Sequence, residues 1–345
     1  MRRFALCLIP VLVIGASSAF SNFKHVHPAA AMTMKAGEFL ASLSREERAT
    51  AQLPYDTPQR VGWHFIPKND RKGLQMRDMS KPQRKLARQL VHSALSQLGY
   101  RKASEIMKLE SILHDMEKSK PGGNIRDSLR YYVTIFGEPE SNQRWGLSFE
   151  GHHMSLNFVV EGERVVSSTP QFFGSNPATI QGENVAGFEK GYRVLGDEEA
   201  LAFELVNSLD EAQLAAALID EKAPREIRAA GEAQPPTDPA AGLAAKKMNA
   251  QQRKLLDNLI GVYAAAMPDE VASARLRAID EAGREQIHFA WAGARQAGIG
   301  HYYRIEGATF QIELVNTQPD PAGNTANHVH CIWRDAHGDF ALPLK

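Results

Sequence analysis

The chain has 345 residues, with 40 basic and 40 acidic residues, 12 histidines and only two cysteines. This length predicts about two domains, and a hydrophobic content of 43% excludes wholesale disorder. A net charge of zero argues against a nucleic-acid-binding protein, which needs a basic surface. Two cysteines exclude a disulfide scaffold and a four-cysteine zinc site. Any metal site must therefore be built from histidines and carboxylates.

The N-terminus predicts export. Residues 1–19 combine Arg2 and Arg3, a short apolar run and small residues at a cleavage site, which is typical of a secretory signal peptide. An uncleaved anchor is the alternative. We expect a flexible segment over 20–35, a periplasmic or secreted protein and no stable membrane insertion after cleavage. Cys7 would leave with the signal, so that Cys331 remains, either as a buried thiol or as a functional one.

The sequence repeats itself in order. The octapeptide at 79–86 (MSKPQRKL) is similar to that at 248–255 (MNAQQRKL), Ser42-Leu43 to Ser208-Leu209, and Glu150-Gly151 to Glu306-Gly307. The colinear order predicts a tandem duplication, with units at 36–196 and 197–345. Chance recurrence of common helix starts is the alternative.

The sequence pattern of each unit predicts helices followed by strands. The chain should therefore have an α+β fold of two pseudo-symmetric units. Hydrophobic periodicity predicts a short helix in each unit, a Pro- and Gly-rich connection (223–245 in the second unit) and two longer helices. The helices are expected at about 36–50, 81–98 and 105–117, then at about 198–219, 250–266 and 268–282. Antiparallel strands follow from 129 and from 287. The apolar alternation changes parity after Gly151 and after Gly307, which predicts a β-bulge at both positions.

Histidines break this repeat. His152-His153 follows Glu150-Gly151 where the second unit has Ala308-Thr309, and His328-Val329-His330 lies on the last predicted strand. Two histidines two apart on a strand share a face and can offer two nitrogens to one metal ion, although a structural pair is the alternative. The candidate ligands are His152, His153, His328 and His330. Only one of His152 and His153 would face the site, and parity leaves open which one.

Neighbouring residues have predicted supporting roles. Glu150 or Asp335 would add a carboxylate, while Arg334-Asp335 is either a local ion pair or, together with Asn327, a support for the ligands from behind. Cys331 should point away from the face of His328 and His330. We expect His288 and His301 to be core residues.

Motifs of the commonest enzyme classes are absent. The chain has no Walker-type loop, no dinucleotide-binding glycine pattern, no Gly-x-Ser-x-Gly elbow and no His-Glu-x-x-His. NTPase, nicotinamide-dependent, α/β-hydrolase and zincin functions are therefore disfavoured.

The residue blocks resemble one known family. Over roughly 35–342 the chain resembles the "domain of unknown function 3500" family, through the runs Trp63-His64-Phe65-Ile66-Pro67, Phe149-Glu150-Gly151-His152-His153, Phe172-Phe173-Gly174 and Asn327-His328-Val329-His330. The resemblance implies that these blocks belong together and that secreted bacterial members are usual. It implies no activity.

The sequence favours an exported metal-dependent enzyme acting on a small molecule or peptide, with hydrolysis ahead of oxygen chemistry. A divalent transition metal (zinc, copper or iron) would activate water, and Glu150 would be the general base. A non-catalytic periplasmic metal- or ligand-binding protein is the alternative, and a structural role for the histidines is the third hypothesis. No nucleic-acid partner is expected, and the oligomeric state stays open.

Overall fold

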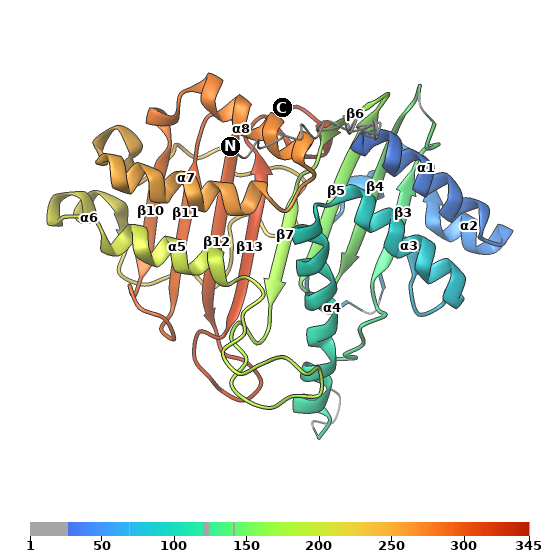
Figure 1. The fold of residues 1–345 in the computed structure, drawn as a ribbon, viewed down its shortest axis with the longest axis horizontal. Coiled ribbons are helices and arrows are strands. Elements are labelled where there is room, and N and C mark those ends of the chain that lie inside the picture. Colours follow the sequence, from blue (N-terminus) through green and yellow to red (C-terminus); the bar gives the residue numbers. More distant parts are fainter. Residues whose placement is uncertain (1–26, 69, 120–123, 141, 345) are drawn as a thin grey trace, which may run out of the picture.

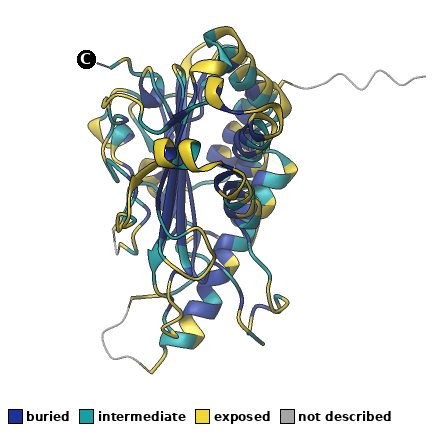
Figure 2. Ribbon diagram, turned by 90° about the vertical axis from the view of Figure 1, so that its left-hand side faces the viewer, coloured by how far each residue is buried: buried dark blue, intermediate teal, exposed yellow. Residues whose placement is uncertain are grey.

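The computed structural model describes residues 27–344 except 69, 120–123 and 141. The predicted signal peptide, 1–19, and residues 20–26 of the segment expected to be flexible lie outside the described residues, whereas residues 28–35 of that segment belong to helix α1. The described chain is an α+β protein with eight α-helices and one mixed sheet of 13 strands. The main helices cover one face of the sheet, and long loops cover the other (Figures 1 and 2). No described helix combines the length and apolar character needed to cross a membrane.

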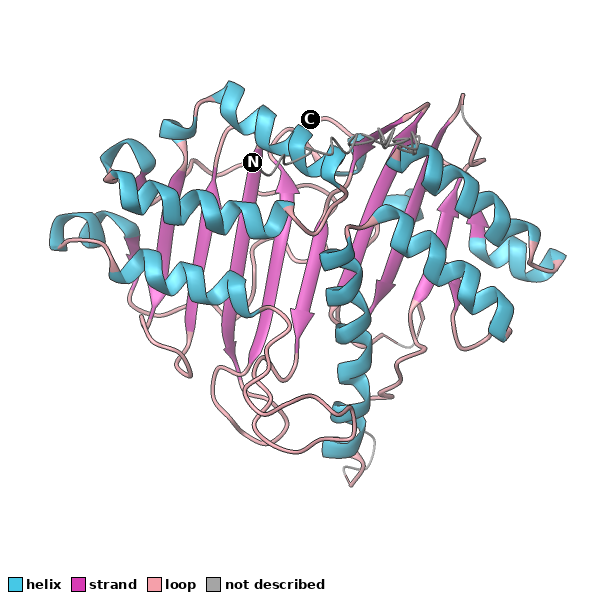
Figure 3. Ribbon diagram, in the orientation of Figure 1, coloured by secondary structure: helices cyan, strands magenta, loops and turns pink. Residues whose placement is uncertain are grey.

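The elements of the first half alternate between short edge strands, helices and long central strands (Figure 3). In chain order they are α1 (Pro28–Ala41), α2 (Arg45–Ala51), β1 (Gln52–Leu53), β2 (Leu74–Gln75), α3 (Lys81–Ala94), α4 (Gln97–Glu117), β3 (Tyr132–Phe136), β4 (Arg144–Gly151), β5 (Met154–Glu161), β6 (Arg164–Ser167) and β7 (Gln171–Ser175).

The second half follows the same order of elements without a counterpart of β6. They are α5 (Gly196–Asn207), α6 (Glu211–Ala217), β8 (Leu218–Asp220), β9 (Leu243–Ala244), α7 (Ala250–Ala264), α8 (Asp269–Ala282), β10 (His288–Gly293), β11 (His301–Glu306), β12 (Phe310–Gln318) and β13 (His328–Asp335).

Both halves contribute to a single continuous sheet. The strand order is β1-β3-β4-β5-β7-β13-β12-β11-β10-β8, with β2, β6 and β9 paired to β3, β5 and β10. The pairings of β1 with β3 and of β8 with β10 are parallel, and the others are antiparallel. The halves meet where β7 pairs with β13, with Gly174 opposite His330. The strand that carries His328 and His330 therefore lies at the centre of the sheet.

Capping explains where the helices begin. Ser44 with Glu47, Ser80 with Gln83, Asp210 with Gln213 and Asn249 with Gln252 form reciprocal capping boxes at α2, α3, α6 and α7. The two helices expected at 36–50 and 198–219 are each two helices. Ser42 and Ser208, which match in the sequence repeat, lie at the C-terminal ends of α1 and α5.

The predicted β-bulges are wrong. Gly151 pairs with Met154, so Glu150-Gly151-His152-His153 is the end of a tight hairpin between β4 and β5. In the second half, Glu306 pairs with Gln311, and the backbone N–H of Gly307 donates to the carbonyl of Phe310 (3.0 Å). A chain reversal changes the parity of the apolar positions just as a bulge does, which is why the pattern could not separate the two.

The sheet separates two apolar clusters. The larger one lies between the sheet and the helices and includes Cys331, while the smaller one, with Phe65, Phe172 and Ile332, lies under the loops. His330 contacts Phe65 and Phe172 on the loop side. The predicted orientation of Cys331, away from the histidine face, is confirmed.

Candidate metal centre

The β4–β5 hairpin holds His153 in a fixed position. Its backbone has φ 61°, a left-handed conformation in which histidine is enriched among non-glycine residues. Its N–H donates to the carbonyl of Phe65, and its carbonyl accepts from the N–H of Gly174, both at 2.8 Å. A Cβ atom on Gly174 would lie 3.0 Å from the rings of both His153 and His330. Glycine at 174 therefore lets the two rings approach over β7.

Three histidines converge at this point. His153, His328 and His330 each offer a ring nitrogen, and these nitrogens lie within 4.8 Å of one another. The Nε2 atoms of His153 and His328 are 2.7 Å apart. His153 and His330 are 3% and 4% exposed, whereas His328 is half-buried. The three residues could hold one metal ion, as predicted from the sequence, and the arrangement does not define which metal.

Polar contacts orient two of the three rings from behind. The Nδ1 atom of His330 lies 2.9 and 2.8 Å from the two carboxylate oxygens of Glu226, and Nδ1 of His328 lies 3.3 Å from the side-chain nitrogen of Asn176. Among the described residues, Nε2 of His330 and Oδ1 of Asn176 are buried without a hydrogen-bond partner. A carboxylate on one imidazole nitrogen, with the other nitrogen free, is the usual arrangement of a metal-ligating histidine.

A rotation of the Asn176 side-chain amide would give its unpartnered Oδ1 atom a hydrogen-bond donor. If Nε2 of His328 is a ligand, Nδ1 carries the proton and needs an acceptor. A half-turn of the Asn176 amide group would place Oδ1 at this position, because the two orientations of an amide exchange the positions of its nitrogen and oxygen. Metal ligation by His328 would thus satisfy the Asn176 oxygen.

Burial keeps the rings of His153 and His328 neutral. It lowers the pKa of His153 far below its ordinary value, with the neighbouring histidines and Arg126 adding to the shift. It also lowers the pKa of His328, to about 2, with a further contribution from His330. Both rings are uncharged at neutral pH, which is the form that donates a lone pair to a metal.

His152 lies beside the three histidines and not among them. Its ring stacks on that of His153 at 3.7 Å between centroids. Its Nδ1 atom lies 2.5 Å from the buried carboxylate of Glu110 and 3.0 Å from the guanidinium of Arg126, which is also paired with Glu117 at 2.7 Å. Burial lowers its pKa, and Glu110 opposes this shift. The structure therefore brings together three of the four candidate ligands.

Glu150 forms an ion pair outside the cluster. Its carboxylate lies 2.7 Å from the ammonium of Lys72 and 4.0 Å from the guanidinium of Arg71, and Ser155 donates to it at 3.3 Å. Arg71 also donates to the carbonyl of His64 at 2.5 Å. These contacts attach the segment that carries Phe65 to the end of β4.

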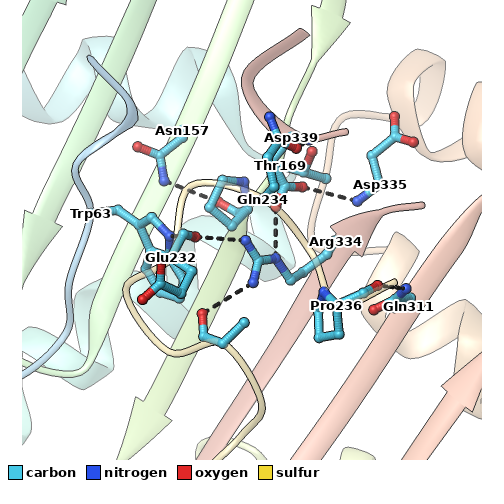
Figure 4. A network of polar contacts seen from close by, with 12 residues as sticks. Trp63, Asn157, Thr169, Glu232, Gln234, Pro236, Gln311, Arg334, Asp335 and Asp339 are labelled. Atoms are coloured by element: carbon cyan, nitrogen blue, oxygen red, sulfur yellow. Dashed lines mark hydrogen bonds and ion pairs between the residues drawn. The ribbon is translucent and has the colours of Figure 1, made fainter. Parts of the chain in front are cut away.

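Arg334 fixes a loop of the second half against β13 (Figure 4). Its guanidinium pairs with Asp339 at 2.7 Å and donates to the carbonyls of Ala229 (3.2 Å) and Glu232 (2.8 Å). Trp63 Nε1 also donates to the Glu232 carbonyl at 2.7 Å. Arg334 thus joins a loop of the second half to the segment that carries Phe65 in the first half.

The other two predicted supporting residues lie at opposite ends of β13. The carboxylate of Asp335 accepts from the N–H of His337 at 2.8 Å and does not pair with Arg334. Asn327 exchanges hydrogen bonds with the backbone of Thr179 (2.7 and 3.1 Å) and donates to Asp320 at 2.8 Å. Asn327 therefore fixes the chain directly before His328.

Sequence reasoning missed Glu226 and Glu110. Glu226 lies in a Pro- and Ala-rich connection and Glu110 on an amphipathic helix, so neither position carries a local signal of function. Asn176 follows the aromatic run Phe172-Phe173-Gly174 within two residues, which is the one local hint of its place. His301, expected in the core, is fully buried, whereas His288 is half-buried.

The fold and this centre define an α+β protein with a three-histidine cluster at the middle of one large sheet. The chain belongs to the family described as "Protein of unknown function (DUF3500)", which matches residues 25–342. No curated protein and no solved structure matches the chain.

Proposed function

We propose that the protein is a metal-dependent enzyme, and a hydrolase in particular, with a divalent transition metal held by His153, His328 and His330. The observation that carries the proposal is the convergence of three ring nitrogens, of which His330 Nε2 is buried and free while Glu226 occupies the opposite nitrogen. Zinc fits a set of three imidazole ligands best, with copper and iron as the alternatives.

Three protein ligands favour catalysis over storage. A catalytic zinc site has three protein ligands and one open position, whereas a structural site is closed by four. His328 is half-buried, which gives solvent access on its side of the cluster. A metal ion bound here would supply an activated water or polarise a carbonyl. Phe65 and Phe172, which stack at 3.9 Å beside His330, would keep the rest of the site dry.

Glu150 fits a structural role better than that of a general base. Its carboxylate is already paired with Lys72, and its contacts fix the loop that carries Phe65. Glu226, by contrast, would position His330 as a ligand.

The alternative is a non-catalytic metal carrier. The burial of His153 and His330 favours it, because a closed site protects its ion from exchange. His152, whose ring stacks on His153, is the nearest candidate for a fourth ligand.

The setting of the protein is also a proposal. We propose that residues 1–19 direct export to a periplasm or beyond, and that the two halves arose by tandem duplication. The order of elements, the palindromic strand order and the matched capping boxes at α2 and α6, and at α3 and α7, support the second proposal.

The test combines metal analysis with turnover. The mature protein, purified without a His tag and loaded with Zn²⁺, should hydrolyse at least one of a panel of model esters, phosphate esters and peptides. A chelator should abolish this turnover and added Zn²⁺ should restore it, while His330→Ala should be inactive. One equivalent of tightly bound metal without any chelator-sensitive turnover would favour the carrier.

A further inference from the structure

A cleft of about 870 Å³ lies next to the histidine cluster on the loop-covered side. Its lining comes from two short stretches, 220–225 (without Glu221) and 317–319. Gln318 is the cross-strand partner of His328, and Arg225 directly precedes Glu226, which contacts His330. The lining thus contains the cross-strand partner of His328 and the residue that precedes Glu226, the carboxylate beside His330.

Hydrogen bonds hold the two walls together. The carbonyl of Arg225 accepts from the Thr317 hydroxyl at 3.2 Å and from the Gln318 amide at 3.3 Å. The carboxylate of Asp220 accepts from the backbone N–H of Lys222 at 2.8 Å. The side chains of Lys222 and Arg225 are exposed, and neither forms an ion pair within the described part of the chain.

A second cleft contrasts with this one. It has about 1160 Å³, lies at the C-terminal end of α4, and includes Arg126, which contacts His152. Three of its cations are paired with carboxylates: Arg126 with Glu117, Lys118 with Asp115 and Arg77 with Asp127. The cleft beside His328, by contrast, has a lining next to the cluster and two cations that lack an ion-pair partner among the described residues.

We infer that the cleft beside His328 receives the substrate, and that the substrate carries an oxyanionic group, a carboxylate or a phosphate, bound by Lys222 and Arg225. The inference rests on the proposed metal centre, because the reacting group would lie at the open metal position. A guanidinium and an ammonium bind such oxyanions through charge-assisted hydrogen bonds. With Asp220 in the same lining, the three charged side chains leave the cleft a net positive charge.

The experiment uses cobalt as a coloured replacement for the native metal. Inorganic phosphate and acetate are titrated separately into the Co²⁺-loaded protein, and the visible absorption of the metal reports binding. Lys222→Ala/Arg225→Ala should bind the preferred anion about tenfold more weakly, since two charge-assisted contacts are lost, while its cobalt content stays unchanged. The comparison of phosphate with acetate identifies the oxyanion.

A matched control removes two cations from the opposite face. Lys254 and Arg277 are exposed on α7 and α8, and Lys254→Ala/Arg277→Ala changes the net charge equally. Its anion affinity should equal that of the wild type. Equal anion affinity in the wild type and Lys222→Ala/Arg225→Ala, or equal weakening in both double variants, would overturn the inference.

Failure of the metal centre has a different signature. If the wild type binds no cobalt, the proposed function fails, and calorimetry of phosphate with the metal-free protein then tests the cleft alone. Binding that is lost in Lys222→Ala/Arg225→Ala would support the anion cleft without a metal. Absence of binding would overturn it.

Discussion

The hairpins β4–β5 and β11–β12, one in each half of the sheet, separate the residues that attach loops from the residues of the histidine cluster. Both have Glu-Gly before the turn, and both glutamates are 3% exposed. Glu150 pairs with Lys72, and Glu306 pairs with Arg228 at 2.8 Å and accepts from the N–H of Ala241 at 3.1 Å. Each glutamate thus holds the loop that directly precedes a short strand of its own half, β2 or β9.

The turns themselves differ. The first hairpin turns through His152 and His153, the second through Ala308 and Thr309. The common element, Glu-Gly, is therefore explained by loop attachment in both halves, and the histidines remain as the feature that needs a separate explanation. The proposed metal chemistry would therefore belong to the junction of β5, β7 and β13, whereas Glu150 and Glu306 attach loops to the sheet.

The largest expected effect is on metal affinity. His328→Ala/His330→Ala removes two of the three proposed ligands, so Zn²⁺ affinity should fall by about a thousandfold or more. Competition with a chromophoric chelator measures it, and His337→Ala, which removes an exposed histidine, is the control. Unchanged affinity in the double variant would remove these residues from any metal site.

Removing Glu150 should cost stability. Glu150→Ala leaves Lys72, whose side chain is 7% exposed, without its partner, and the free energy of unfolding should fall by roughly 3 kcal/mol. Glu306→Ala should cost less, because Arg228 keeps Glu313 at 2.9 Å. Urea unfolding measures both. If Glu150→Ala is as stable as the wild type but loses turnover, Glu150 is the base and the comparison of the hairpins fails.

The second half has its own buried histidine, with a structural role. The His301 side chain is fully buried, and its Nε2 atom lies 2.8 Å from the carboxylate of Glu199. Burial lowers its pKa to about 4. The unfolded chain binds a proton at this ring near pH 6.5 and the folded chain does not, so stability falls as the pH drops from about 6.5 to 4. The loss should reach about 3 kcal/mol.

Unfolding at several pH values tests this linkage. His301→Gln should flatten the dependence between pH 6.5 and 4, whereas His337→Gln should leave it unchanged. An unaltered slope in His301→Gln would contradict the assignment of that slope to His301.

The smallest effect concerns the residue behind His330. Glu226→Gln should weaken Zn²⁺ binding by about 10- to 100-fold, because the amide no longer provides a charged acceptor for Nδ1. Glu221→Gln, an exposed neighbour in the same loop, is the matched control. Equal affinities in the two variants would show that Glu226 does not position the ligand.

The sequence predicted those parts of the molecule that depend on local patterns. The helices expected from periodicity at 81–98, 105–117, 250–266 and 268–282 correspond to α3, α4, α7 and α8, although α4 begins eight residues earlier than expected, and the shared face of His328 and His330 follows from strand geometry. The hairpin at His152-His153 could not be separated from a bulge, because both change the parity of the side chains.

The remaining features depend on distant segments. Glu226 reaches His330 from 104 residues away, and Glu110 reaches His152 from 42 residues away. The choice of His153 over His152 comes from one left-handed residue and from the hydrogen bonds of its backbone to Phe65 and Gly174. Tertiary packing decides these contacts, and no single segment carries a sign of them.

X-ray absorption spectroscopy of the Zn²⁺-loaded, tag-free protein tests the central claim most directly. We expect one equivalent of zinc with three imidazole nitrogens and one further light ligand, and loss of the imidazole signal in His328→Ala/His330→Ala. Less than about a tenth of an equivalent of metal after loading, or a coordination sphere without imidazoles, would contradict a metal centre at these three histidines.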